Sequence, residues 1–260
     1  MKSIFLLLAT ISFLSLSAQD VVVVKNLNDL LKHSALKFKD GIFSAKIGAG
    51  TLFAVKDVKI DLTKKYQVSA EFKSAGKKPN VYVGFVPYDA NKRQISSIAI
   101  NDVPKTLTSL AKDAKKGDKV LYLTDCTKWR KNTPHGYIVF NAKSDFSDLP
   151  NTTALAIEKN IVKKDNLYVV TLKKPLNKDY AAKTLVRQHV ATSAFIYAKF
   201  GYVGNQWTKM SGVISGMAKQ GAHNKKFWPK TVFIRPLILV NSGDKTSQLE
   251  FKNFKLEIVK

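Results

Sequence analysis

The sequence predicts an all-β protein in which an antiparallel β-sandwich is interrupted by a small inserted β-domain, with little helix. Strict alternation of apolar and polar residues in the stretch 66–73, YQVSAEFK, is typical of a strand with one buried and one solvated face. Similar stretches bounded by Gly, Pro, Asn and Ser recur along the chain, while no long segment has the 3.6-residue period of a helix. Between residues 103 and 190 the chain is denser in charge and contains its own set of short strands.

The stretch 66–101 is the centre of the predicted sandwich. A turn, SAGKKPN, joins the strand at 66–73 to a second strand in which Val81, Val83 and Phe85 face inward. We therefore expect a hairpin, followed by a further strand at 95–101. Its polar face carries Glu71, Tyr82 and Tyr88 and is expected to lie near Tyr197 and Arg235.

The other predicted strands divide into two groups. Outside the insert they are expected at 21–24, 42–47, 51–55, 58–62, 194–202, 207–214, 232–240 and 247–259, and inside it at 119–123, 137–140, 153–158, 160–162, 167–172 and 184–189. In the last strand Leu249 and Phe251 share one phase, whereas Phe254 and Leu256 take the other. One extra residue near Asn253, a β-bulge, accounts for this change.

The N-terminus has the pattern of a secretory signal peptide. Lys2 is followed by an apolar run at 4–16 and by small residues before Gln19, and the run is too short to span a membrane. We predict a signal peptide at 1–18, a discontinuous sandwich at 19–102 and 191–260, and an inserted β-domain at 103–190. The mature chain is expected to be secreted, periplasmic or at the cell surface, without a transmembrane span. Cys126 is the single cysteine, so no internal disulfide forms, and we interpret it as a buried small hydrophobe.

The chain is strongly basic, and its excess charge is almost all lysine. The formal net charge is +24, yet only four arginines occur, at 93, 130, 187 and 235. Proteins that read nucleic acid use arginine for bidentate contacts to phosphate and guanine, so we predict no nucleic-acid partner. A lysine coat suits long-range attraction to polyanions such as sulfated or uronic polysaccharides, although it is also consistent with a compositional bias of the source.

No catalytic constellation is visible in the sequence. The stretch GVISG at 212–216 does not match the G-x-S-x-G elbow, and the four histidines lack metal-ligand spacing. A pair of glycosidase carboxylates cannot be identified either. We therefore predict that the protein is not an enzyme, while a lyase or hydrolase whose residues converge only in the fold stays open.

Aromatic and polar residues on the predicted strand faces are candidates for sugar binding. Sugar rings stack their C–H faces on aromatic planes, and their hydroxyls bind amide, carboxylate and guanidinium groups. Trp129 and Trp228 are expected in the cores, whereas Trp207 follows a turn and suits either burial or ligand contact. Arg235 lies in an apolar strand and needs a partner, either a carboxylate such as Glu71 or an anionic ligand group. The candidate carbohydrate-binding residues are Glu71, Tyr82, Tyr88, Arg93, Tyr197, Trp207 and Arg235.

Several stretches carry a resemblance to a known family. KKYQVSAEFKSAG, VYVGFVPYDANKRQI, WTKMSGVISG, FWPKTVFIRPLILVN and FKNFKLEIVK resemble the galactose-binding-like jelly-roll modules of carbohydrate-binding type, which occur in secreted bacterial proteins that handle polysaccharides. The insert, with KKGDKVLYLTDCTKW and DNLYVVTLKKPL, is similar to small β-domains, barrel-like in our reading, of phage-tail and glycan-active proteins.

The resemblance implies a jelly roll and non-catalytic binding of a polysaccharide or glycan, with an anionic polysaccharide as one option. It also raises a structural calcium ion, although only Glu250 and Asn253 are available near the last strand; no other cofactor is predicted. The alternative function is a structural or surface-interaction protein with no sugar ligand.

Overall fold

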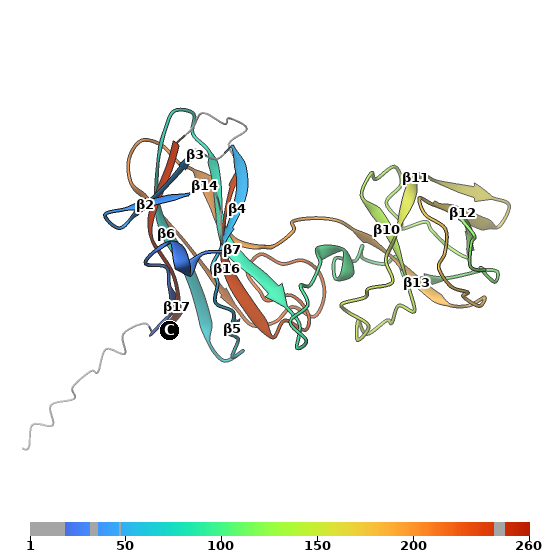
Figure 1. Cartoon of the computed structure of the whole chain (residues 1–260). Helices are drawn as coiled ribbons and strands as arrows, with labels where there is room; N and C mark the ends of the chain where they lie inside the picture. The colour runs from blue at the N-terminus through green and yellow to red at the C-terminus, as the bar shows by residue number, and fades with distance from the viewer. Residues whose placement is uncertain (1–18, 32–35, 47, 242–247) are drawn as a thin grey trace, which may run out of the picture.

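The computed structural model describes residues 19–31, 36–46, 48–241 and 248–260, so the signal peptide predicted at 1–18 lies outside the described residues. These residues form a nearly all-β protein, as predicted, with strands β1 to β17 and two short 3-10 helices, η1 (Leu27–Asp29) and η2 (Ser97–Ala99). Figure 1 shows two bodies, a sandwich and an insert, joined by two chain segments. None of the described helices is long and apolar enough to cross a membrane.

Two antiparallel sheets make up the sandwich. The first sheet has the order β15 (Thr208–Ser215), β6 (Lys65–Ala75), β17 (Gln248–Val259), β3 (Ile42–Lys46) and β2 (Lys37–Lys39), with β1 (Gln19–Val23) paired to β17. The second has the order β14 (Ile196–Tyr202), β7 (Asn80–Tyr88), β16 (Phe233–Asn241) and β4 (Ala49–Phe53), with β5 (Val58–Lys59) paired to β16. After β14 the chain alternates between the sheets, so consecutive strands face each other across the core rather than pairing.

The core of the sandwich is filled by the inward residues of both sheets. Besides aliphatic residues it contains fully buried aromatic side chains, among them Tyr66, Phe72, Phe85, Phe251, Phe254 and Trp228. Those that lie in strands occupy the positions that the alternating pattern assigns to the inner face, because neighbouring side chains of a strand point to opposite sides.

The predicted hairpin between the strands at 66–73 and 81–88 is wrong. Strand β6 pairs with β15 and β17, whereas β7 pairs with β14 and β16 in the opposite sheet. The connection 76–79 arches between the sheets, beginning at Gly76 with φ 96°. An extended connection of this length reaches about 13 Å, which spans the roughly 10 Å between packed sheets. Both strands are therefore internal, and their outer faces point away from each other.

The strand predicted at 95–101 is also wrong, because this segment contains η2. The Ser96 side chain accepts a hydrogen bond from the Ile98 backbone N–H and thereby caps a tight turn. Serine competes with the sheet ladder in this way, and the residues ISSIAIN do not alternate strictly. The β-bulge predicted near Asn253 is confirmed: the β17–β6 register shifts between Lys252 and Lys255, and Asn253 has φ 53°.

Residues of the insert form a separate six-stranded sheet. Its order is β8 (Thr108–Ser109), β13 (Leu185–Val190), β10 (Gly136–Phe140), β11 (Leu155–Lys164), β12 (Leu167–Leu172) and β9 (Val120–Leu123). The two edges meet, because the Ala111 N–H donates to the Tyr122 carbonyl at 2.8 Å and the Thr124 N–H to the Ser109 carbonyl at 3.1 Å. The predicted strands 153–158 and 160–162 are one irregular strand, β11. Cys126 and Trp129 are buried in a core of its own, as expected. The domain boundaries at 103 and 190 stay a prediction.

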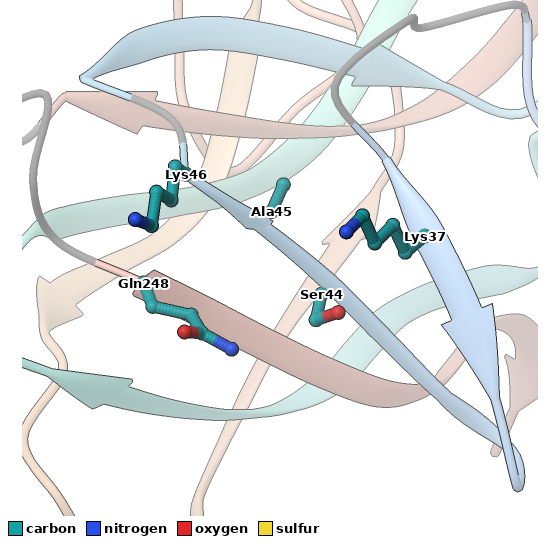
Figure 2. Close-up of a pocket in the computed structure, with 5 residues that line it drawn as sticks. All are labelled: Lys37, Ser44, Ala45, Lys46 and Gln248. Atoms are coloured by element: carbon teal, nitrogen blue, oxygen red, sulfur yellow. The ribbon is translucent and has the colours of Figure 1, made fainter.

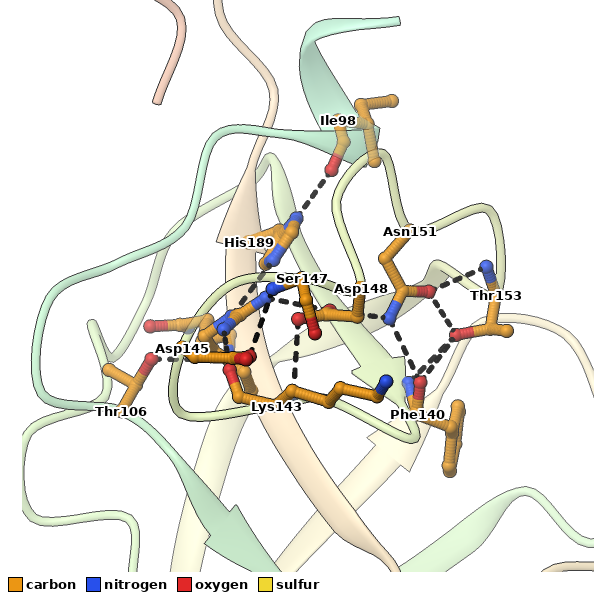
Figure 3. Close-up of polar contacts among 12 residues, drawn as sticks. Ile98, Thr106, Phe140, Lys143, Asp145, Ser147, Asp148, Asn151, Thr153 and His189 are labelled. Carbon is orange, nitrogen blue, oxygen red and sulfur yellow. Dashed lines mark hydrogen bonds and ion pairs between the residues drawn. The ribbon is translucent and has the colours of Figure 1, made fainter. Parts of the chain in front are cut away.

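A buried polar network holds the insert against the sandwich. Arg187 and Asp148 form an ion pair at 2.8 Å, with side chains only 3% and 6% exposed. Arg187 Nε donates to His189 Nε2 at 3.3 Å, and His189 Nδ1 donates to the Ile98 carbonyl in η2 at 2.6 Å (Figure 3). Because both ring nitrogens have these partners, the imidazole is neutral with its proton on Nδ1. The network therefore ties strand β13 of the insert to η2 beside the sandwich.

Candidate functional site

The outer surface of the second sheet carries a cluster of aromatic rings, which we call the aromatic face: Phe53, Tyr82, Phe195, Tyr197 and Phe200. The Tyr82 ring lies 4.8 Å from Tyr197 and 5.5 Å from Phe200, measured between ring centroids. Phe195 lies 6.2 Å from Tyr197 and 5.7 Å from Phe53. The rings therefore form one continuous path across strands β4, β7 and β14.

Strand register brings these rings together. Tyr82 stands opposite Phe200, and Gly84 stands opposite Tyr197. A Cβ atom at Gly84 would overlap the backbone carbonyl of Ile196, so only glycine allows β14 to lie this close. Residues 197 and 200 would point to opposite sides of a regular strand. The bulge between Tyr197 and Lys199 adds one residue to β14 and so places Phe200 on the same face as Tyr197.

The aromatic face is open to solvent at one end. Phe200 is 60% exposed and Tyr202, two residues further along β14, is 71% exposed. The Tyr82 hydroxyl accepts a hydrogen bond from the Asn80 amide at 2.9 Å, which fixes its direction. Burial raises the pKa of Tyr197, with a smaller contribution from Tyr82, so the Tyr197 hydroxyl stays protonated at neutral pH. The face thus combines fixed phenol groups with a freely accessible ring.

Tyr88 and Arg235 lie on the same outer surface at the other end of β7. The guanidinium carbon of Arg235 lies 5.3 Å from the Tyr88 ring centroid, and Arg235 Nε donates to Asp57 at 2.7 Å. This hydrogen bond raises the pKa of Arg235, and burial raises the pKa of Tyr88. The expected carboxylate partner of Arg235 is therefore present, but it is Asp57 and not Glu71.

Glu71 and Trp207 lie on the outer surface of the first sheet, away from the aromatic face. Glu71 accepts a hydrogen bond from the Asn253 amide at 2.8 Å and lies 3.7 Å from the Lys252 ammonium. The Lys252 and Lys73 ammonium groups stand 4.4 and 5.7 Å from the centroid of the Trp207 ring. Both candidates are thus engaged within the protein, which lowers their availability for a sugar. The expectation that Glu71 shares a face with Tyr82 is wrong, because β6 and β7 belong to different sheets.

Two shallow cavities flank the first sheet. One of about 350 Å³ is lined by Glu71, Asn253 and Lys209 among others. Another of about 350 Å³ is lined by Lys37, Ser44, Ala45, Lys46 and Gln248 (Figure 2). Among the described residues, neither lining contains an aromatic ring on which a sugar ring could stack.

The seven predicted site residues therefore separate into three places. Tyr82, Tyr88, Tyr197 and Arg235 share the second sheet, Glu71 and Trp207 share the first, and Arg93 lies in the loop after β7, paired with Asp89 at 2.8 Å. Sequence reasoning missed Phe53, Phe195 and Phe200. Phe195 has the same parity as Tyr197 and could have been found, whereas the parity of Phe200 depends on a bulge that the sequence does not reveal.

Metal-binding side chains do not gather within the described residues. No cluster of three or more His, Cys, Asp or Glu side chains there could hold a metal ion. The two residues raised for calcium have partners within the protein: Glu250 pairs with Lys73 at 3.3 Å, and the Asn253 amide donates to Glu71 at 2.8 Å. The structural calcium ion stays a prediction. Cys126 is fully buried, and burial raises the pKa of its thiol to about 12, which disfavours the reactive thiolate at neutral pH.

Comparisons with known proteins add little to this picture. No protein-family model matches the chain, and no curated protein is similar to it in sequence. Among solved structures, the carbohydrate recognition domain of Emp46p in its metal-free form is similar over 90% of this chain and 89% of that chain, at 13% identity and a TM-score of 0.28. A similarity this weak carries no argument about function.

Proposed function

We propose that this chain is a secreted, non-catalytic carbohydrate-binding protein that stacks sugar rings on its aromatic face. The observation that carries the proposal is the continuous path of rings through Tyr82, Tyr197 and Phe200 on the outside of the second sheet. Soluble proteins rarely leave such a patch uncovered without a partner. The secretory part of the proposal rests on the signal pattern at 1–18.

The chemistry of the aromatic face suits a sugar ring. Phenyl and phenol planes accept the C–H face of a pyranose, while the Tyr82 and Tyr197 hydroxyls and the Asn80 amide provide hydrogen-bond partners for its hydroxyls. The rings are held in place by cross-strand contacts, so little side-chain freedom is lost on binding.

We further propose that the preferred polysaccharide is anionic. The formal charge of +24 attracts polyanions at long range, and the Lys92 ammonium and the Arg235 guanidinium lie near the Tyr88 end of the same sheet. Affinity for a sulfated or uronic polymer should then fall as salt is raised, because exposed charges are screened beyond about 10 Å at 0.1 M salt.

Affinity gels that contain sulfated, uronic or neutral polysaccharides test the proposal. The variants Tyr82→Ala and Phe200→Ala should weaken binding by roughly thirtyfold each, since truncation of a central aromatic anchor costs about 2 kcal/mol or more. Tyr122→Ala, in strand β9 of the insert, is the matched control and should bind like the wild type. An absence of retardation of the wild-type protein on every gel would sink the proposal.

The alternative, a structural or surface-interaction protein, is favoured by the exposure of Phe200 and Tyr202, since aromatic residues are enriched at protein interfaces. Tyr82 and Trp207 occupy different sheets, so their alanine variants test two faces of the sandwich separately. The alternative predicts that neither variant changes glycan retention. Carbohydrate binding predicts a loss with Tyr82→Ala and little change with Trp207→Ala.

A further inference from the structure

A cavity of about 650 Å³ lies where the loops of the sandwich meet the insert. The sandwich contributes the loop 89–93 after β7, residues near β5, and Lys230 before β16, and the insert contributes the loop 147–150. Pockets of this size that bind small molecules occur preferentially at domain interfaces. The aromatic face does not contribute to this cavity.

The lining of the cavity includes apolar residues from both bodies. The sandwich contributes Ile60, Met217 and Leu62, which is 49% exposed. From the insert, Leu149 is buried in the core of the sandwich, and Pro150 follows it in the lining. Because Leu149 is packed in this core, the loop 147–150 that lines the cavity is held in place.

The carboxylates in the lining are already neutralised. Asp89 accepts hydrogen bonds from the backbone N–H groups of Asn91 and Arg93 and from the Arg93 side chain, and these bonds lower its pKa. Asp148 is bound to Arg187 in the buried network, between His189 and Asn151 (Figure 3). Neither carboxylate is therefore free to repel an anion.

Cationic and polar groups in the lining remain available. The Arg93 side chain is 73% exposed and uses Nε and Nη2 for Asp89, which leaves Nη1 without a hydrogen bond to any described residue. Among the same residues, the side chains of Lys230 and Asn91 make no hydrogen bond or ion pair, whereas the Ser147 hydroxyl bonds to the Asp145 carboxylate and lowers its pKa. The cavity thus offers the Lys230 ammonium, the remaining Nη1 donor of the Arg93 guanidinium paired with Asp89, and the polar groups of Asn91 and Ser147, beside apolar side chains.

We propose that this junction cavity binds one sugar unit that carries a carboxylate or a sulfate ester. The anionic group binds between Arg93 and Lys230, because guanidinium and ammonium donors form charge-assisted hydrogen bonds to both kinds of oxyanion. The C–H face of the ring packs on Leu62 and Pro150, and its hydroxyls reach Asn91 and Ser147. The inference goes beyond the aromatic face but rests on the same premise, that the partner is a glycan.

Isothermal titration calorimetry on the full mature chain tests this site. The probes are digalacturonate, a monosulfated galactose disaccharide, the neutral galactose disaccharide and sodium sulfate. The two anionic sugars should bind, and comparing them tells which anionic group is preferred. Binding of the neutral sugar with equal affinity, or of sodium sulfate as tightly as the sulfated sugar, would overturn the proposal.

Matched variants assign the binding to the cavity. Arg93→Gln and Lys230→Asn should each weaken the anionic sugars by about ten- to a hundredfold, as expected for the loss of a hydrogen bond to a charged group. Arg130→Gln and Lys183→Asn are the controls. Both controls remove an exposed cation outside the cavity, and Lys183 shares with Lys230 a left-handed backbone, with φ 68° and 62°. Equal effects of the cavity variants and the controls would contradict the assignment.

The outcome also separates this cavity from the aromatic face. Tyr122→Ala, the control in strand β9, should leave binding of the anionic disaccharides unchanged, because Tyr122 belongs to neither surface. If Tyr82→Ala abolishes it while Arg93→Gln does not, the cavity inference is wrong and the proposed function stands. If Arg93→Gln weakens the binding of every glycan and Tyr82→Ala weakens none, the cavity is the binding site and the aromatic face is not.

Discussion

The buried ion pair between Asp148 and Arg187 makes the stability of the junction directly testable through Asp148→Asn. The change keeps the shape of the side chain and removes its charge. Asp148 accepts hydrogen bonds from the Lys143 backbone N–H at 3.0 Å, from Arg187 at 2.8 Å and from the Asn151 amide at 2.9 Å. An asparagine has only one acceptor oxygen, so its amide hydrogens would face a donor.

The expected cost follows from burial. With both side chains less than a tenth exposed, loss of the carboxylate removes the hydrogen-bonded partner of the Arg187 cation in the interior and leaves Asp102 as a nearby carboxylate. Removing one partner of a buried pair costs about 3–5 kcal/mol, a large part of the roughly 5–15 kcal/mol that holds a typical protein folded. Replacing both partners, as in Asp148→Leu with Arg187→Met, should recover much of this loss.

Urea unfolding followed by circular dichroism and tryptophan fluorescence measures the effect. Trp129 is buried in the core of the insert and Trp228 in that of the sandwich, so the two bodies each contain a buried reporter. Asp179→Asn is the control, since Asp179 is exposed: it pairs with Lys115 and accepts a hydrogen bond from the Lys116 backbone N–H at the surface, so the unfolding midpoint should move little. A loss below about 1 kcal/mol for Asp148→Asn would refute the reasoning that the network holds the junction.

Three further predictions concern single residues. Burial lowers the pKa of His189 to about 4, below its unfolded value of 6.5. The contribution of the neutral imidazole to the free energy of unfolding is therefore complete above pH 6.5 and falls by about 3 kcal/mol as the pH drops to 4. His189→Gln should flatten this part of the stability–pH curve, and an unchanged slope would contradict the assignment. Gly84→Ala should lower the free energy of unfolding in urea by about 1–3 kcal/mol and reduce glycan retention, because the added methyl group would meet the Ile196 carbonyl. Gly204→Ala is the control and should change neither quantity, since the nearest atom to its added methyl group would be Lys78 Cε at 3.8 Å. Cys126 should not react with a disulfide reagent at pH 8 in the folded protein, and it should react fully in guanidinium; rapid labelling of the folded chain would be inconsistent with a pKa raised to about 12.

Periodicity was sufficient to predict the inner faces of the strands, but not their partners. The alternation in 66–73 assigns Tyr66, Val68 and Phe72 to the core, where they lie. The same alternation is satisfied whether the next strand pairs alongside or packs across, because both arrangements bury the same side chains. The choice between hairpin and arch depends on the turn 76–79 and on strands more than a hundred residues away. Neither contribution can be evaluated from the local pattern.

The sequence could predict only those parts of the candidate site that depend on the alternation of side chains within one strand. Tyr82, Tyr88 and Tyr197 follow from alternation, and the structure brings Tyr82 and Tyr197 into contact. The bulge in β14 adds Phe200 to this cluster, and the sheet assignment removes Glu71 from it. The partner of Arg235 was predicted as a class, a carboxylate, but Asp57 lies 178 residues away in sequence, and no local signal links the two.

Strand β7 links the two proposed binding surfaces, and this connection predicts a dependence on polymer length. Tyr82 belongs to the aromatic face, Tyr88 ends the strand, and Arg93 follows in the loop that lines the junction cavity. Six residues of strand separate Tyr82 from Tyr88, which corresponds to about 20 Å. A polysaccharide long enough to reach both surfaces binds the second one intramolecularly, so its affinity should exceed that of a disaccharide by about 10²–10⁴-fold.

Affinity measured across a ladder of uronate oligomers should therefore rise steeply once the oligomer spans this distance. Either Tyr82→Ala or Arg93→Gln alone should abolish the steep rise while leaving the short oligomers' affinity for the remaining site. A smooth, shallow increase that both variants share would mean that the two surfaces do not engage one chain.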